Sequence, residues 1–117
     1  MTALVTPDDV PAWMGGLVEA TADIDARAFT RIKPPPDGSG RPAAVLMLFG
    51  EGHDGPDVLL LRRADTLGSH PGQVAFPGGA ADPTDDGPVD TALREAFEET
   101  GVLREGVRPV ATLPRLY

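Results

Sequence analysis

Hydrophobic positions in residues 88–100 recur at the spacing of an amphipathic helix, at about 100° per residue. Pro88 suits the first turn of such a helix, Asp86 can cap it, and Gly101 can take the left-handed conformation that ends it. The pattern therefore predicts a helix over 88–100 with one buried stripe. The side chains of that stripe are Val89, Ala92, Leu93, Ala96 and Phe97.

Shorter apolar runs predict strands on both sides of this helix. Residues 43–49 and 58–61 are apolar, and turn-forming residues lie between them at 50–56, so we expect a hairpin of buried strands. His53 falls in that turn, where a solvated loop residue is more common than a ligand. A run at 107–113 predicts a further strand.

The N-terminal third predicts helix and linker. Thr6 and Pro7 precede two acids, which is a helix-start pattern, and apolar residues continue it at helical spacing. Residues 19–29 predict a second, more polar helix. We therefore divide the chain into a helical segment at 1–32, a Pro/Gly-rich linker at 33–42 and an α+β domain at 43–117.

Charge and composition narrow the classes of function. A net charge of −8 over 117 residues argues against nucleic acid and anionic membrane surfaces as partners. It does not exclude a phosphorylated small molecule, because a bound cation can reverse the local field. The absence of cysteine excludes disulfides, thiolate chemistry and cysteine-ligated zinc. We see no secretory signal and no apolar run of about 18 residues, and expect a cytoplasmic protein.

The predicted helix carries three carboxylates on one strip, since Glu95, Glu98 and Glu99 fall within an arc of roughly 100°. Like charges at these spacings cost a few tenths of a kcal/mol per pair. The helix dipole also disfavours anions in the last turn. One interpretation is a solvated acidic face. The other is a cage for a hard divalent cation, which prefers several oxygen ligands close together.

The residues before the helix favour the cage. Phe-Pro-Gly-Gly at 76–79 lets backbone approach a ligand closely, and an acidic loop then leads to Arg-Glu-Ala-Phe-Glu-Glu-Thr-Gly-Val at 94–102. This string resembles the signature of the Nudix hydrolases, and 94–102 matches its second half at every position. The position eight before Arg94 is Asp86, where that family usually has Glu. Because Gly79 lies one residue further away than usual, Asp85 is a rival for this acidic position.

A second run resembles the coenzyme A pyrophosphatase branch of the same family. That branch carries His-x-Gly-Gln-Val-x-Phe-Pro-Gly-Gly, which this chain matches at His70, 72–74 and 76–79. The run before it departs from the branch pattern, and these departures bear on substrate contacts more than on the branch. They are Leu61 for Thr, Ala64 for Ser, and Gly68 where a basic residue is common.

The resemblance implies an α+β fold, a Nudix-type α/β/α sandwich with a mixed sheet, of which the C-terminal part is missing here. It implies hydrolysis of a pyrophosphate bond in coenzyme A or a derivative, giving 3′,5′-ADP and 4′-phosphopantetheine, with Mg²⁺ or Mn²⁺. The alternatives are another nucleoside diphosphate-linked substrate, a non-catalytic Nudix-fold module or fragment, and an acidic domain with a solvated helix face. The partner would be a small diphosphate, with no nucleic acid or membrane, and a homodimer is compatible with the family.

Roles for individual residues follow from the same resemblance. Glu98 and Glu99 would be the main metal ligands, with Glu95 as ligand or base and the Gly79 carbonyl completing the shell. Arg94 would orient an acid, either a helix glutamate or the loop at 85–86. The candidates for substrate binding are Arg62, Arg63, His70 and Gln73. A structural histidine and ordinary strand-end arginines are the alternatives for three of them.

Overall fold

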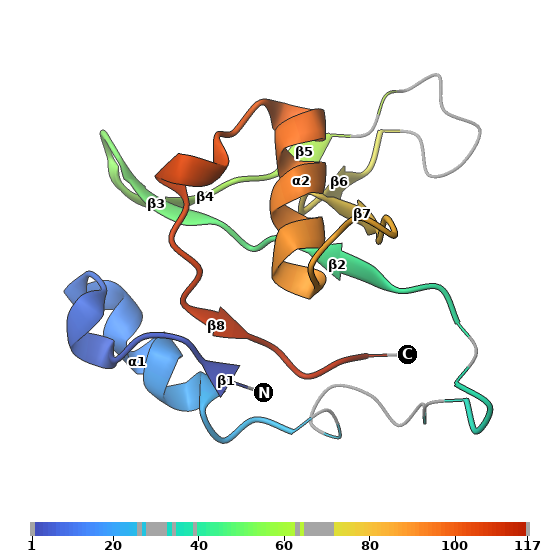
Figure 1. Ribbon diagram of the computed structural model, residues 1–117. Coiled ribbons are helices and arrows are strands. Elements are labelled where there is room, and N and C mark those ends of the chain that lie inside the picture. Colours follow the sequence, from blue (N-terminus) through green and yellow to red (C-terminus); the bar gives the residue numbers. More distant parts are fainter. Residues whose placement is uncertain are drawn as a thin grey trace. The chain divides into compact units, whose positions relative to one another are not determined.

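A computed structural model describes residues 2–25, 27, 33, 35–38, 40–62, 64 and 72–116. Contacts divide the chain into two compact units, of which Arg41–Val107 is called the α2 unit. Met1–Gly40 and Arg108–Tyr117 together make up the α1 unit. Each unit combines one α-helix with at least one antiparallel strand pair (Figure 1), which confirms the α+β class. The predicted division at residues 33–42 stays a prediction.

The α2 unit is built on helix α2, Pro88–Thr100, which has the bounds predicted from the sequence. Gly101 ends it with a φ of +77°, also as predicted. The predicted Asp86 cap is wrong. Gly87 stands at the cap position with a φ of +146°, and the Asp90 carboxylate accepts the Asp86 N–H at 3.0 Å. The Asp90 carboxylate in the first turn thus fixes the backbone just before the helix, and no side chain caps the helix itself.

Helix α2 packs on strand β2, Ala43–Val45, and strand β7, Gly78–Ala80 (Figure 1). The two strands pair antiparallel with Ala44 opposite Gly79. Residues with small side chains on both surfaces let the helix approach the strands closely, and Ala96 is fully buried there. The buried face includes Thr91 and leaves Phe97 51% exposed, so the predicted stripe is wrong at Phe97. The contact face is rotated toward Thr91.

Two further strand pairs belong to this unit. Strand β3, Phe49–Gly52, forms a hairpin with strand β4, Gly55–Val58, and His53 lies in its turn, as predicted. The predicted strand bounds are wrong, because the hairpin lies largely within 50–56, predicted as turn, and residues 43–45 pair with β7 instead of with 58–61. Strand β5, Leu61–Arg62, pairs with strand β6, Val74–Ala75. A short 3₁₀ helix, η3, spans Arg104–Gly106.

The prediction of buried strands is wrong, because side chains along 43–49 and 58–61 alternate between half-buried and exposed. The outward apolar side chains are each between 37% and 62% exposed. They are Val45, Met47, Phe49, Val58, Leu60, Val74 and Phe76.

The α1 unit contains strand β1, Thr2–Ala3, 3₁₀ helix η1, Pro7–Asp9, helix α1, Ala12–Thr21, and strand β8, Ala111–Thr112. The helix-start pattern at Thr6 produces η1, in which the Asp9 carboxylate accepts the Thr6 N–H at 3.0 Å. Pro11 separates η1 from α1 because proline lacks the N–H that a continuous helix requires. Strands β1 and β8 pair antiparallel.

Two other predictions change in this unit. The second helix predicted at 19–29 overlaps α1, which continues to Thr21, while residues 26, 28 and 29 lie outside the described residues. The strand predicted at 107–113 is confined to Ala111–Thr112. Among the described residues, no helix has the length and apolar character needed to cross a bilayer.

We predict that Gly101→Ala destabilises the protein by about 1 kcal/mol, because a Cβ is disfavoured at a φ of +77°. Gly106→Ala is the matched control, since Gly106 has no positive φ and its Cβ would meet open space. Urea unfolding measures both. Equal stabilities for the two variants would contradict the assigned helix end.

Candidate functional site

Arg94 lies at the centre of the site, on the side of α2 that faces the acidic loop. Its Nε donates to Asp85 Oδ1 at 2.9 Å and its Nη2 to Asp85 Oδ2 at 3.0 Å. Nη2 also donates to the Ala80 carbonyl at 2.9 Å. The paired N–H groups match the two carboxylate oxygens, which is the strongest geometry available to an arginine. The loop and the end of β7 are thereby tied to the helix.

The Asp85 side chain is only 4% exposed and is held from two more directions. It accepts the Asp82 N–H at 2.9 Å and the Thr91 hydroxyl at 2.8 Å. The hydrogen bonds from Arg94, followed by those from Asp82 and Thr91, hold the pKa of the Asp85 carboxyl well below its ordinary value. Folding therefore favours the ionised carboxylate. The pair stabilises the fold above the ordinary pKa of the carboxyl, and this contribution is lost as the pH falls through the lowered value.

The third guanidinium nitrogen of Arg94 lies between two of the predicted metal ligands. Nη1 donates to Glu95 Oε1 at 3.1 Å and contacts Glu98 Oε2 at 3.2 Å. The Glu95 side chain is 19% exposed and that of Glu98 is 54% exposed. Hydrogen bonds to Asp85, Glu98 and Glu95 raise the pKa of Arg94 above its ordinary value. Two carboxylates thus converge on a single positive centre.

Glu99 has a different neighbour from the other two glutamates. Its Oε1 accepts the Gly78 N–H at 2.9 Å, which places this carboxylate against β7. Glu95 also lies against β7, because a Cβ on Gly79 would fall 2.5 Å from the Glu95 carboxyl carbon. In the described part of the chain, no three His, Cys, Asp or Glu side chains stand together as a ready metal-binding group. Glu95 and Glu98 thus form a pair at Arg94, whereas Glu99 stands apart and contacts Gly78.

The donor set nevertheless has the chemistry that a hard cation needs. Glu95 and Glu98 supply carboxylate oxygens on either side of a position that already attracts positive charge. Gly79 has no side chain, so the Glu95 carboxylate can lie close against the backbone of β7. These residues could hold a Mg²⁺ or Mn²⁺ ion.

The predicted substrate-binding residues are only partly described. Arg62 ends β5 and pairs with Val74 of β6, and Gln73 immediately precedes Val74, so the two polar residues lie at the same strand pair. Both are exposed. Arg63 and His70 lie outside the described residues.

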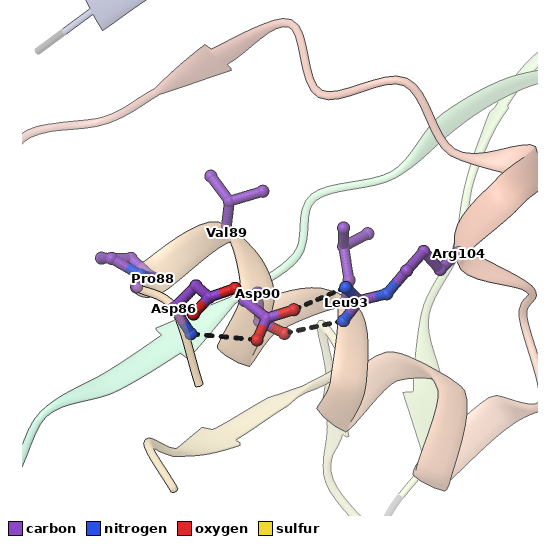
Figure 2. Close-up of a pocket in the computed structure, with 7 residues that line it drawn as sticks. Asp86, Pro88, Val89, Asp90, Leu93 and Arg104 are labelled. Atoms are coloured by element: carbon purple, nitrogen blue, oxygen red, sulfur yellow. Dashed lines mark hydrogen bonds and ion pairs between the residues drawn. The ribbon is translucent and has the colours of Figure 1, made fainter. Parts of the chain in front are cut away.

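A second charged contact, which sequence reasoning missed, lies at the start of α2 (Figure 2). Arg104 of η3 pairs with the Asp90 carboxylate at 2.5 Å, and the Asp86 N–H donates to the same carboxylate. These two groups lower the pKa of Asp90, the backbone hydrogen bond having the larger effect. They border an open pocket of about 350 Å³ with apolar walls that include Val89 and Leu93. None of the glutamates discussed above lines it.

The part of the chain that contains the Arg94 site matches a known protein family. Residues 39–117 match the NUDIX domain family. An uncharacterised Nudix hydrolase NudL of Photorhabdus laumondii is 43% identical over 98 residues, covering 81% of this chain and 52% of the relative. An uncharacterised NudL of Pectobacterium atrosepticum is 53% identical over 64 residues, covering 55% of this chain and 33% of the relative.

The chain spans about a third to a half of the length of these relatives. Among solved structures, a NUDIX hydrolase from Alicyclobacillus acidocaldarius is 38% identical, with a TM-score of 0.47 over 62% of this chain and 44% of that one. The family match covers more than half of the sequence and includes every residue of the Arg94 site. The chain therefore belongs to the Nudix family.

Proposed function

We propose that this protein is a metal-dependent hydrolase of a pyrophosphate bond. One observation carries the proposal: Arg94, held by Asp85, brings the carboxylates of Glu95 and Glu98 to one point beside the glycines of β7. Such a pair is electrostatically unfavourable unless a positive charge lies between its members. Family membership and the curated relatives named as Nudix hydrolases support the reaction class.

Each part of the site has a chemical task in this proposal. Mg²⁺ or Mn²⁺, when bound, would supply positive charge to neutralise the phosphates and to activate a water. Glu98, which is exposed, and Glu99, which accepts the Gly78 N–H, would hold the ion. Glu95, held against β7, is a further ligand or accepts the proton of the attacking water. The Gly79 carbonyl is the fourth candidate ligand, and Arg94 orients the two carboxylates that it contacts.

For the substrate, we propose coenzyme A or a derivative, cut to 3′,5′-ADP and 4′-phosphopantetheine. Support comes from the run containing His70 and Gln73, which resembles the coenzyme A pyrophosphatase branch. Arg62, next to Gln73 across β5 and β6, is a candidate for binding the phosphates. Another nucleoside diphosphate-linked compound is the alternative substrate. We propose the cytoplasm as the compartment of the reaction.

A second candidate is a Nudix-fold module that binds a diphosphate without cutting it. The observation that favours it is the separation of Glu99 from the Glu95–Glu98 pair. Metal binding that leaves coenzyme A and other diphosphates intact would support this candidate.

We predict that Glu98→Gln lowers the rate of coenzyme A hydrolysis with Mg²⁺ by more than about 100-fold. Removing a group that only orients a metal ligand typically lowers metal affinity or activity by about 10- to 100-fold. Because Glu98 is proposed as a ligand itself, its loss should have a larger effect. Release of 3′,5′-ADP, measured by chromatography, is the readout. Glu105→Gln removes the same charge from an exposed residue of η3 and is expected to retain the wild-type rate.

Two outcomes separate the parts of this proposal. If the wild-type protein releases no 3′,5′-ADP but cuts another diphosphate in a substrate panel, the coenzyme A assignment is wrong and the reaction class stands. Near-normal turnover by Glu98→Gln would remove the metal-ligand role of this residue.

We predict that Gly79→Ala lowers metal affinity, whereas Gly78→Ala lowers the stability of the fold. At Gly79 the three atoms nearest to the new Cβ all belong to the flexible end of Glu95, so we expect the fold to persist while Mn²⁺ affinity falls about 10-fold. At Gly78 the new Cβ would lie 2.5 Å from the Ala44 carbonyl oxygen, within the β2–β7 pair, and should destabilise the fold by about 2–3 kcal/mol. Urea unfolding and calorimetric Mn²⁺ titration measure the two effects. Unchanged Mn²⁺ affinity in Gly79→Ala would argue against a site beside Glu95.

A further inference from the structure

We propose that two copies of this chain pair edge to edge, through the strand that contains β2 and β3. This strand, residues 41–52, is called the edge strand. Its partner is the same strand of a second copy, antiparallel and related by a two-fold axis beside Leu46. The family resemblance is compatible with a homodimer but identifies no surface for one. The proposal uses none of the residues assigned to the metal site or to substrate binding.

Backbone hydrogen bonds occupy only one edge of the edge strand. Those to β7 and β4 are made by its even-numbered residues, among them Pro42, Leu46 and Leu48. Successive residues of a strand direct their N–H and C=O groups to opposite edges, so β7 and β4 pair with the same edge. The odd-numbered residues direct these groups to the other edge. Within the described part of the chain, no strand pairs with that second edge.

The two short strands β2 and β3 belong to one extended stretch (Figure 1). Exposure alternates without a break from residue 43 to residue 51, with every odd-numbered residue exposed and every even-numbered one half-buried. Arg41 continues the stretch at its start, because the residue before a proline is restricted to extended conformations. The open edge thus runs from residue 41 to residue 51 and is longer than most strands.

This open edge lacks the features that protect most exposed strand edges. Between residues 43 and 49, its odd-numbered residues carry no charge and include no proline. They are Ala43, Val45, Met47 and Phe49, of which the last three are 59%, 40% and 38% exposed. Such an edge favours the addition of another strand, because pairing satisfies its backbone groups and covers its apolar side chains.

The charges of the edge strand select a second copy as the added strand. Arg41 and Glu51 stand at equal distances along the sequence from Leu46, at the two ends of the apolar stretch. Antiparallel pairing about Leu46 places each Arg41 directly opposite the partner's Glu51, and opposite charges in such positions stabilise the pairing. Two copies with a net charge of −8 each repel one another overall. At this edge their charges attract instead.

The apolar residues pair in the same register. Val45 lies opposite the partner's Met47, and Ala43 lies opposite the partner's Phe49, so none of these side chains faces a charge. Each pairing joins odd-numbered residues, whose N–H and C=O groups point toward the partner strand. The two-fold arrangement uses the open edges of both copies, and the expected assembly is a closed dimer.

Charge reversal tests this register, with sedimentation velocity as the measurement. We expect the wild-type protein to form a dimer whose fraction rises with concentration. Glu51→Arg places two arginines opposite each other at both ends of the pairing and should weaken dimerisation by about 10-fold. Adding Arg41→Glu restores opposite charges and should restore the wild-type affinity. Glu105→Arg makes the same change of charge on an exposed residue of η3 and is expected to dimerise like the wild type.

Several sedimentation results would overturn the proposal. The first is a wild-type protein that stays monomeric up to its solubility limit. The second is wild-type affinity in Glu51→Arg, and the third is a double variant that associates no more strongly than Glu51→Arg alone. Assemblies larger than a dimer would also contradict it, because two-fold pairing leaves neither open edge available.

Cysteine pairs test the register directly, because the chain contains no cysteine. Opposite residues that exchange both backbone hydrogen bonds have Cα atoms about 5.5 Å apart, within the range of a disulfide. We expect a mixture of Ala43→Cys and Phe49→Cys to form a covalent dimer when diamide oxidises the thiols. Either variant alone should form none, since each cysteine lies about 20 Å along the strand from its equivalent in the partner. Equal crosslinking in the mixture and in the separate samples would contradict the proposal.

Urea unfolding establishes that each variant is folded before its association is measured. If Phe49→Cys does not fold, the charge-reversal series decides, because Arg41 and Glu51 are both exposed. None of these measurements involves a metal or a substrate. A monomeric protein would therefore leave the proposed hydrolase function standing, and a dimer without turnover would leave the pairing standing.

Discussion

The guanidinium of Arg94 connects the acidic loop, strand β7 and helix α2 through one side chain. It binds the acidic loop at Asp85, the end of β7 at Ala80, and two glutamates of its own helix. Each of these contacts uses a different direction of the planar group. Three carboxylates, those of Asp85, Glu95 and Glu98, share the single positive charge of Arg94. The geometry of the loop and the arrangement of the glutamates therefore depend on one another.

Close packing of α2 on β2 and β7 makes this arrangement possible. Ala96 on the helix and the glycines of β7 bring the backbones together, and Gly79 leaves room for the Glu95 carboxylate against the strand. A larger residue at Ala96 would push the helix away, and its acidic edge would lose the hydrogen bond from the Gly78 N–H. A side chain at Gly79 would instead displace the Glu95 carboxylate. The small residues of the family signature therefore position the acidic side chains as well as filling the core.

Much of this architecture could be predicted from local sequence patterns. The bounds of α2, its end at Gly101 and the hairpin around His53 follow from periodicity and turn chemistry, which act over a few residues. The strip of glutamates follows from helix geometry alone. The family assignment made from the spacing of 94–102 is confirmed by the match over 39–117.

Other features depend on contacts between residues far apart in the sequence. The choice between Asp85 and Asp86 is decided by Arg94, nine residues from Asp85, and by the conformation of Gly87, neither of which spacing reveals. The Asp90–Arg104 pair joins α2 to η3 in a way that no short motif records. Phe97 was assigned to the buried stripe because periodicity gives a face but not its exact rotation on the strands.

The outward side chains of the strands affect how this chain behaves in solution. Val45, Val74 and Leu60 are each about half exposed or more, and four further large apolar residues on the strands or next to them are exposed as well. Strongly hydrated anions such as sulfate are excluded from the protein surface, and this exclusion favours the burial of exposed apolar side chains. Ammonium sulfate should therefore drive this chain onto hydrophobic chromatography media or into precipitates at lower concentrations than its acidic composition alone would suggest.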